Sequence, residues 1–315
     1  MSKQIKIINF MGQRKVAATI SIVLLVLSIA SLAVNHLNFG LDFTGGTEVE
    51  LEYQNSANLE QIRKDLKAEG YRSAVVTNFG SDKNVLIRVQ VSDAKDGEEA
   101  KLGEQIKAFL TSKATGDVRL KRISFVGPQI GDELRDDGGL GMLVALAMVM
   151  AYIAIRFQWK FSIGAVAALI HDVIIVLGLF SVTGIDFDLT VLAAVLAVIG
   201  YSLNDTIVVS DRIRENFRIL RDKAPLEVIN ISLSQTLGRT IITSFTTLLV
   251  LLALFFVGGE VIHSFAIALI TGVVVGTYSS IYVAANVLLV MGVSKEDLIQ
   301  LEVEKEGADQ DEITF

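Results

Sequence analysis

Ionisable side chains occur at three points inside long apolar stretches of this sequence. His171 and Asp172 are adjacent near the middle of one stretch. Asn204 and Asp205 lie near the end of the next stretch, and Arg239 begins the one after it. A charged side chain at the centre of a membrane helix costs about 2.5–3.5 kcal/mol on insertion scales, so such residues usually serve a function. A buried carboxylate beside a movable arginine can bind and release a proton, which makes Asp205 and Arg239 a candidate proton site.

Each of these groups also has a structural interpretation. A static ion pair between two helices is the alternative for Asp205. Arg239 can anchor a helix end to lipid headgroups, because the arginine side chain extends its charge toward water. His171 and Asp172 can form a buried, hydrogen-bonded packing pair. The sequence alone leaves these alternatives open.

The elements that position these residues are predicted to be membrane-spanning helices. Hydrophobic residues make up 51% of the 315 residues and charged residues only 20%, which argues against a soluble protein. Six apolar stretches are long enough for a bilayer, which takes about 20 helical residues. The predicted fold class is therefore an α-helical polytopic membrane protein with six transmembrane helices. The predicted spans are residues 16–34, 138–155, 161–183, 187–209, 240–257 and 265–291.

The positions of lysine and arginine predict the orientation. Four of them lie in the N-terminal tail, residues 1–15, and six lie in the loop 210–239, whereas the loops 184–186 and 258–264 have none. Lysine and arginine concentrate in short cytoplasmic loops, so both termini are predicted to be cytoplasmic. The acidic tail 292–315 then lies in the cytoplasm as well. Residues 35–137 are expected to form a single exterior, periplasmic domain.

Alternating patterns within 35–137 predict a small α+β domain. Strands are expected at 47–53, 74–79, 85–91 and 118–126, with one helix between Asn58 and Gly70 and another at 98–113. The order β-α-β-β-α-β is that of the ferredoxin-like fold, which hosts many functions. The preceding segment 40–47, GLDFTGGT, resembles a phosphate-binding loop, but Gly46 stands where the required lysine would be. We interpret it as a tight turn between membrane and sheet.

Composition excludes several kinds of site. The chain has no cysteine, so disulfides, cysteine-ligated metals and a cysteine nucleophile are excluded. Three histidines without an H-E-x-x-H pattern leave little for a histidine-based metal site. The net charge of −7 gives no general attraction to nucleic acid. We therefore predict no cofactor, no metal, no nucleic-acid partner and no enzymatic activity.

Five segments together resemble the SecD/SecF protein-export membrane proteins, which are built on the plan of the RND superfamily. They are GLDFTGGT at 40–47, FVGPQIG at 125–131, HDV at 171–173, GYSLNDTIVVSDRIREN at 200–216 and TLGRTIITS at 236–244. The resemblance implies an auxiliary subunit of the Sec translocase in the bacterial inner membrane. It also implies that Asp205 and Arg239 act in proton transport, with Asn204, His171 and Asp172 as further candidates for the pathway. The family's working unit has twelve spans, so this chain alone is expected to lack a complete proton path.

The resemblance also implies partners. They are a SecD subunit, the SecYEG channel, YajC, YidC, membrane lipids and the translocating preproteins, whose transport and release the proton motive force would promote. Two other functions remain open: an RND-type exporter of small molecules or lipids, and a passive scaffold for translocon subunits. A scaffold would tolerate neutral substitution of Asp205. The side chains at Asn204 and Asp205 do not distinguish H⁺ from Na⁺ as the coupling ion.

Overall fold

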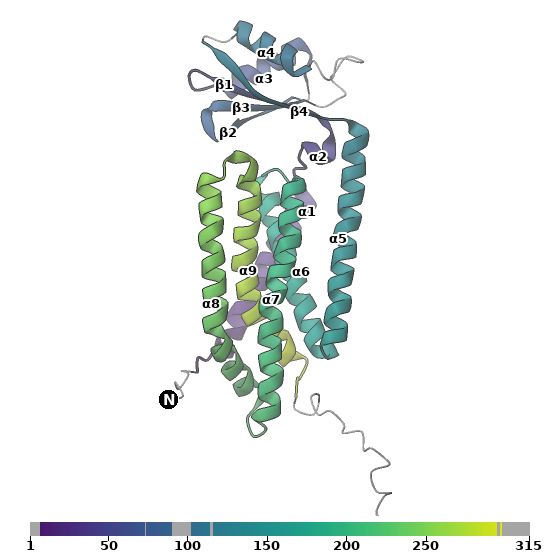
Figure 1. Cartoon of the computed structure of the whole chain (residues 1–315), viewed down its shortest axis with the longest axis vertical. Coiled ribbons are helices and arrows are strands. Elements are labelled where there is room, and N and C mark those ends of the chain that lie inside the picture. The colour runs from purple at the N-terminus through teal and green to yellow at the C-terminus, as the bar shows by residue number, and fades with distance from the viewer. Residues whose placement is uncertain (1–6, 73, 90–101, 114–115, 295–296, 298–315) are drawn as a thin grey trace, which may run out of the picture.

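The computed structural model describes residues 7–72, 74–89, 102–113, 116–294 and 297. Its described part consists of a long helical bundle with a small sheet domain at one end (Figure 1). Six helices in this part are long and apolar enough to cross a membrane, which confirms the predicted fold class. They are α1 (Arg14–Val34), α5 (Pro128–Arg156), α6 (Trp159–Thr183), α7 (Leu189–Ile219), α8 (Pro225–Val257) and α9 (Glu260–Val290).

Several helices extend well beyond the apolar stretches. Helix α5 begins at Pro128 rather than near 138, and α7 continues to Ile219. Because α8 begins at Pro225, the segment 210–239, expected as a loop, is mostly helical and turns only at 220–224. Hydropathy predicts only the part of a helix that lies in the apolar interior of a membrane. The helix itself can continue into water with polar side chains. Proline suits the first turn of both α5 and α8, where no backbone N–H partner is needed.

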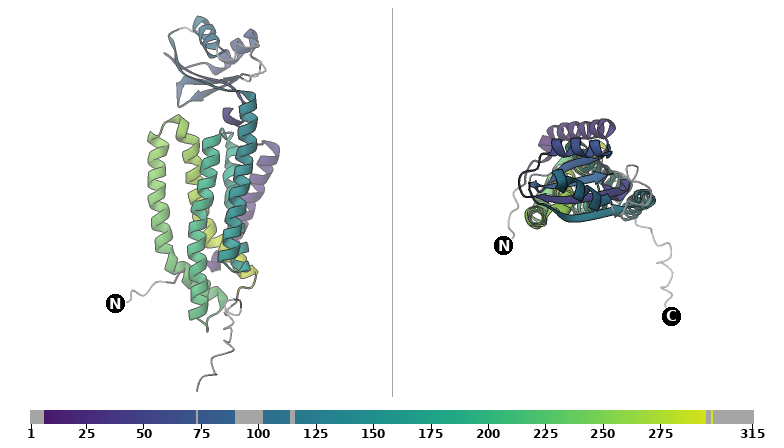
Figure 2. Two further views of the ribbon diagram at one scale, coloured as in Figure 1. Left: turned by 45° about the vertical axis from the view of Figure 1, so that its right-hand side comes forward. Right: turned by 90° about the horizontal axis from the view of Figure 1, so that it is seen from above.

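Helices α6, α7 and α9 form the centre of the bundle, with α1 against α6 and α9 (Figure 2). Small residues allow this close packing. A Cβ atom added at Gly272 of α9 would lie 2.1 Å from the Val198 side chain of α7. One added at Gly276 would lie 3.0 Å from Ser202. Helices α5 and α8 lie at the periphery and expose most of their apolar side chains.

The sheet domain has the predicted ferredoxin-like order. Helices α3 and α4 cover one face of the antiparallel sheet, whose strand order is β2-β3-β1-β4, and the other face is turned toward the bundle (Figure 1). The side chain of Asn58 accepts a hydrogen bond from Gln61 N at the start of α3, and Gly70 ends that helix at φ 111°. The elements are β1 (Gly46–Tyr53), α3 (Leu59–Glu69), β2 (Val75–Phe79), β3 (Ser81–Val89), α4 (Leu102–Lys113) and β4 (Val118–Val126).

One boundary in this domain differs from the prediction by several residues. Strand β3 starts at Ser81 rather than 85, because Gly80 at φ 76° makes the turn so tight that Phe79 pairs directly with Ser81. The predicted strand and helix residues 90–91 and 98–101 lie outside the described residues.

The glycine-rich segment 40–47 connects the sheet domain to the bundle. It contains the short helix α2 (Leu41–Thr44), followed by Gly45 at φ 64° and Gly46 at φ 128°, as its interpretation as a turn requires. Gly40 N donates to the carbonyl of Phe187 in the α6–α7 connection, and Phe187 N donates to Asn38. The domain is therefore hydrogen-bonded to the same connection from which α7 begins.

An ion-pair cluster adds a second contact at this junction. Arg88 of β3 lies 2.6 Å from Asp186 in the α6–α7 connection and 3.3 Å from Glu48 of β1. Burial opposes the charge of Arg88, but the hydrogen bonds and charges of Asp186 and Glu48 outweigh it and raise the pKa of this guanidinium. The sheet domain and the Leu189 end of α7 are thus joined by polar contacts, so a movement of either one would strain them.

Candidate functional site

Asp205 is a buried carboxylate without a complete set of partners. It lies on α7 and is only 2% exposed. Its Oδ2 atom is buried and has no hydrogen-bond partner among the described residues. An ionised carboxylate in such a place is costly, since nothing replaces its hydration. The arrangement fits a group that takes up a proton, because a protonated carboxyl is far cheaper to bury.

Arg239 lies near Asp205 without touching it. Its charge acts on Asp205 from α8, but the two side chains, both within the described residues, form no ion pair. Arg239 is exposed on the outside of this chain. The static ion pair considered from the sequence is therefore absent from this structure. Asn204, next to Asp205 on α7, is also exposed and points away from the core.

His171 and Asp172 form a separate, fully buried cluster. His171 Nδ1 lies 2.9 Å from Asp172 Oδ1. Asp172 Oδ2 accepts hydrogen bonds from Ser202 Oγ of α7 and Ser279 Oγ of α9, at 2.5 and 2.7 Å. One carboxylate thus connects α6, α7 and α9, and both of its oxygens have partners. Ser202 precedes Asp205 by three residues, so the two lie on one face of α7.

Sequence analysis missed the two serines and Tyr278. The Tyr278 ring stacks on His171, and its hydroxyl donates to the Ala17 carbonyl of α1. Small hydroxyl residues in apolar helices are ordinarily packing residues, so their types gave no signal. The only available signal was the spacing of Ser202 from Asp205. This spacing could not predict the contacts between helices that are far apart in the sequence.

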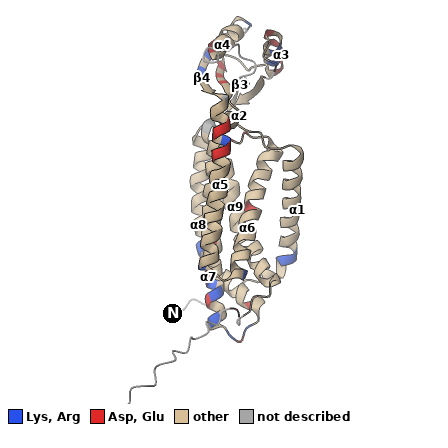
Figure 3. Cartoon of the chain, turned by 90° about the vertical axis from the view of Figure 1, so that its right-hand side faces the viewer, with Lys and Arg blue, Asp and Glu red and all other residues tan. Residues whose placement is uncertain are grey.

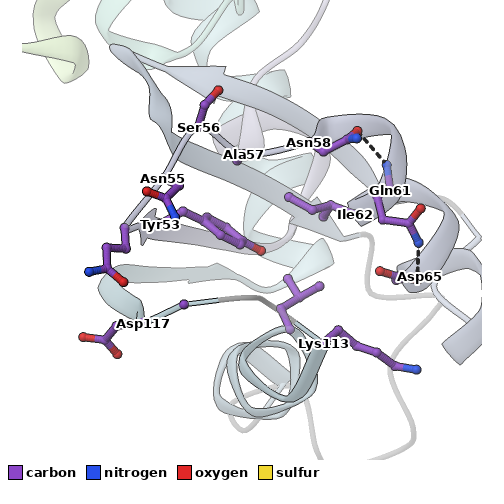
Figure 4. A pocket seen from close by; sticks show the side chains of 13 residues that line it. Tyr53, Asn55, Ser56, Ala57, Asn58, Gln61, Ile62, Asp65, Lys113 and Asp117 are labelled. Carbon is purple, nitrogen blue, oxygen red and sulfur yellow. Dashed lines mark hydrogen bonds between the residues drawn. The ribbon is translucent and has the colours of Figure 1, made fainter.

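A hollow lies in the sheet domain, at the end of β1 between α3 and α4 (Figure 4). Its volume is about 200 Å³, and its wall is half polar, with Asn55, Gln61 and Lys113 among its side chains. Burial, and secondarily the charge of Asp65, raise the pKa of Tyr53 in this wall to about 12. No cluster of three or more metal-ligating side chains occurs anywhere in the described residues.

These features define a class: a multi-pass membrane protein with a buried titratable carboxylate in its bundle and one ferredoxin-like domain on top. Comparison with family models narrows the class further. The model described as protein export membrane protein SecD/SecF, C-terminal, matches residues 105–294. The model of the SecD/SecF GG motif matches residues 30–57, which include the junction segment 40–47. The chain belongs to the SecD/SecF family.

Within the family the chain groups with the SecF subunits. It is 51% identical to protein translocase subunit SecF of Vibrio alginolyticus, over 98% of this chain and 97% of the relative. The same subunit of Escherichia coli O157:H7 is 43% identical over 98% of this chain and 95% of its own length. The crystal structure of SecDF from Thermus superposes with a TM-score of 0.82 at 36% identity. That match covers 92% of this chain and 39% of the SecDF chain.

Proposed function

We propose that this chain is an auxiliary subunit of Sec protein export that, with a SecD partner, uses the proton motive force to promote preprotein translocation and release. The observation that carries the proposal is the free Oδ2 of Asp205, buried on α7 beside the charge of an exposed arginine. A proton can neutralise this carboxylate, and Arg239 can approach it when the proton leaves. Asp205 and Arg239 are the proposed proton-exchanging pair.

Helix α7 offers a physical route from that pair to the exterior domain. It is continuous from Leu189 to Ile219 and carries Asp205 in its middle. Its outer end is attached to the sheet domain, because Asp42 Oδ2 accepts a hydrogen bond from Leu189 N and Arg88 holds Asp186. We propose that a shift of α7 on proton exchange moves the sheet domain. Because the cluster around Asp172 joins α6, α7 and α9, these three helices would move together as one unit.

A SecD partner is proposed because this bundle is incomplete as a proton path. Arg239 faces outward, and α5 and α8 present long apolar faces. The matched SecDF structure is a single chain of which this one spans 39%. A second set of spans against this surface would enclose Arg239. SecYEG, YajC and YidC are proposed as further contacts in the bacterial inner membrane, with the preprotein meeting the sheet domain.

Translocation into inverted membrane vesicles tests the function. Vesicles from cells lacking this protein would receive it together with its SecD partner, and completion of preprotein transport would be measured after ATP is removed. We expect stimulation only while a proton gradient is present. Equal stimulation without the gradient would support a passive scaffold instead. No effect on preprotein transport at all would favour an exporter of small molecules or lipids.

Cysteine labelling tests the proposed orientation. Lysine and arginine concentrate at the end of the bundle far from the sheet domain, while acidic residues mark the start of α5 (Figure 3). Because the sequence has no cysteine, single introduced cysteines can be labelled selectively. A membrane-impermeant maleimide added to intact spheroplasts is expected to label Asn55→Cys and to spare Asp222→Cys, both exposed positions. Asp222→Cys should react after lysis, and the reverse pattern would overturn the orientation.

A further inference from the structure

Thr240 of α8 has a buried hydroxyl group without a partner. Its side chain is 1% exposed, and its Oγ1 makes no hydrogen bond with any described residue. Other threonines of the same helix differ, because Thr236, Thr243 and Thr246 each donate to the carbonyl four residues earlier. A threonine in a helix commonly makes this bond. The Thr240 hydroxyl does not, so it is available to a partner on another helix.

The packing of α7 on α8 brings Thr240 to the level of Asp205. Tyr201 Oη of α7 donates to Ser244 Oγ of α8 at 3.2 Å, and the two helices run in opposite directions. One turn farther from the sheet domain than Tyr201, α7 carries Asp205. One turn farther from the sheet domain than Ser244, α8 carries Thr240. Because side chains four residues apart lie on one face of a helix, Asp205 and Thr240 face the same contact between α7 and α8.

The chemistry of the two side chains is complementary. Asp205 Oδ2 is buried and, like Thr240 Oγ1, has no partner among the described residues. A hydroxyl can donate to an ionised carboxylate and can accept from a protonated one, so the pairing is possible in either protonation state. The charge of Arg239, the residue before Thr240, acts on Asp205, which agrees with the closeness of this turn of α8. Two unpartnered oxygen atoms therefore lie on facing turns of two packed helices.

We propose that Thr240 is a positioning residue for Asp205, and that its hydroxyl bonds to Asp205 Oδ2 while Arg239 is turned outward. The inference rests on the proton exchange proposed above. Consecutive side chains of an α-helix point about 100° apart, so a rotation of α8 about its axis would replace Thr240 by Arg239 at the carboxyl group. Arginine only donates and suits the ionised carboxylate, whereas the hydroxyl suits both forms. Asp205 then has a partner before and after it loses its proton.

Infrared difference spectroscopy of the full chain, copurified with its partner and reconstituted in phospholipid vesicles, tests the contact. The C=O stretch of protonated Asp205 is the pH-dependent band that Asp205→Asn removes. Thr240→Val deletes the hydroxyl at nearly constant size and is expected to move this band to higher wavenumber, because the carboxyl loses a hydrogen bond. Thr240→Ser keeps a hydroxyl and should leave the band in place. Thr236→Val is the matched control, since Thr236 is buried one turn away and bonds to its own helix.

Preprotein transport by the same variants, at matched abundance, gives the functional readout. Thr240→Val should lower proton-driven stimulation roughly 2- to 12-fold, the range expected for one hydrogen bond, while Thr240→Ser and Thr236→Val stay near wild type. An Asp205 band that Thr240→Val does not move would overturn this inference alone and leave the proposed function standing. Thr240→Ser behaving like Thr240→Val would overturn it as well. If no pH-dependent band disappears in Asp205→Asn, proton exchange at Asp205 fails, and this inference fails with it.

Discussion

Asp205→Asn is expected to abolish proton-driven stimulation of preprotein transport while the protein remains abundant and associated with its partner. Asparagine has nearly the size of aspartate but neither its charge nor its titration. The wild-type carboxylate is buried with Oδ2 unpartnered, so a neutral side chain is no more costly to bury at this position. Transport in inverted vesicles should fall to the level measured without a proton gradient. Immunoblotting at matched abundance separates this loss from a folding defect.

Arginine variants extend the test to the second member of the pair. Arg239→Lys keeps the charge but loses the planar two-point donor, so partial activity is expected, and Arg239→Met should be nearly inactive. Because no ion pair joins Arg239 to Asp205 in this structure, neither change should lower abundance in proportion to activity. Full activity of the combined Asp205→Asn and Arg239→Met protein would contradict proton coupling. That result would favour the passive scaffold, which tolerates neutral substitution of Asp205.

The sequence was informative where local chemistry determines structure. Asn58 and Gly70 delimit α3 because a capping side chain and a left-handed glycine act on their own neighbours. The six spans followed from apolar length, which a bilayer demands of any helix. The ends of α7 and α8 did not follow, since a polar helix and a polar loop have similar composition.

The candidate site was predictable in its residue types and less so in its contacts. A charged residue in an apolar stretch is conspicuous, so Asp172 and Asp205 could be selected. Which carboxylate has free oxygens depends on Ser202 and Ser279, which reach Asp172 from two other helices. The two serines can approach Asp172 because small residues let the helices pack closely, as where Gly276 lies against Ser202. The tertiary fold determines which of these small residues face one another. The sequence therefore predicts two candidate carboxylates, and the geometry separates the two: both oxygens of Asp172 have partners, whereas Oδ2 of Asp205 has none among the described residues.

That separation leads to an expected difference between two substitutions of Asp172. Asp172→Ala removes the acceptor of hydrogen bonds from His171, Ser202 and Ser279. Hydrogen bonds between membrane helices contribute about 0.6 kcal/mol each on average and at most about 1.7, so the loss should destabilise the bundle by about 2–5 kcal/mol. Thermal unfolding of the purified complex in mild detergent measures it. Ser280→Ala, which removes a hydroxyl bonded only within α9 among the described residues, is the matched control.

Asp172→Asn is expected to behave differently, because the amide can reproduce all three hydrogen bonds. Its oxygen accepts from both serines, and its NH₂ donates to His171 Nδ1 once the ring adopts the other neutral tautomer. We therefore expect near wild-type stability and substantial proton-driven transport, in contrast with Asp205→Asn. A stable but inactive Asp172→Asn protein would show that Asp172 also carries a proton. If Asp172→Asn is active and Asp205→Asn is not, the same substitution distinguishes a carboxylate that holds helices together from one that must titrate.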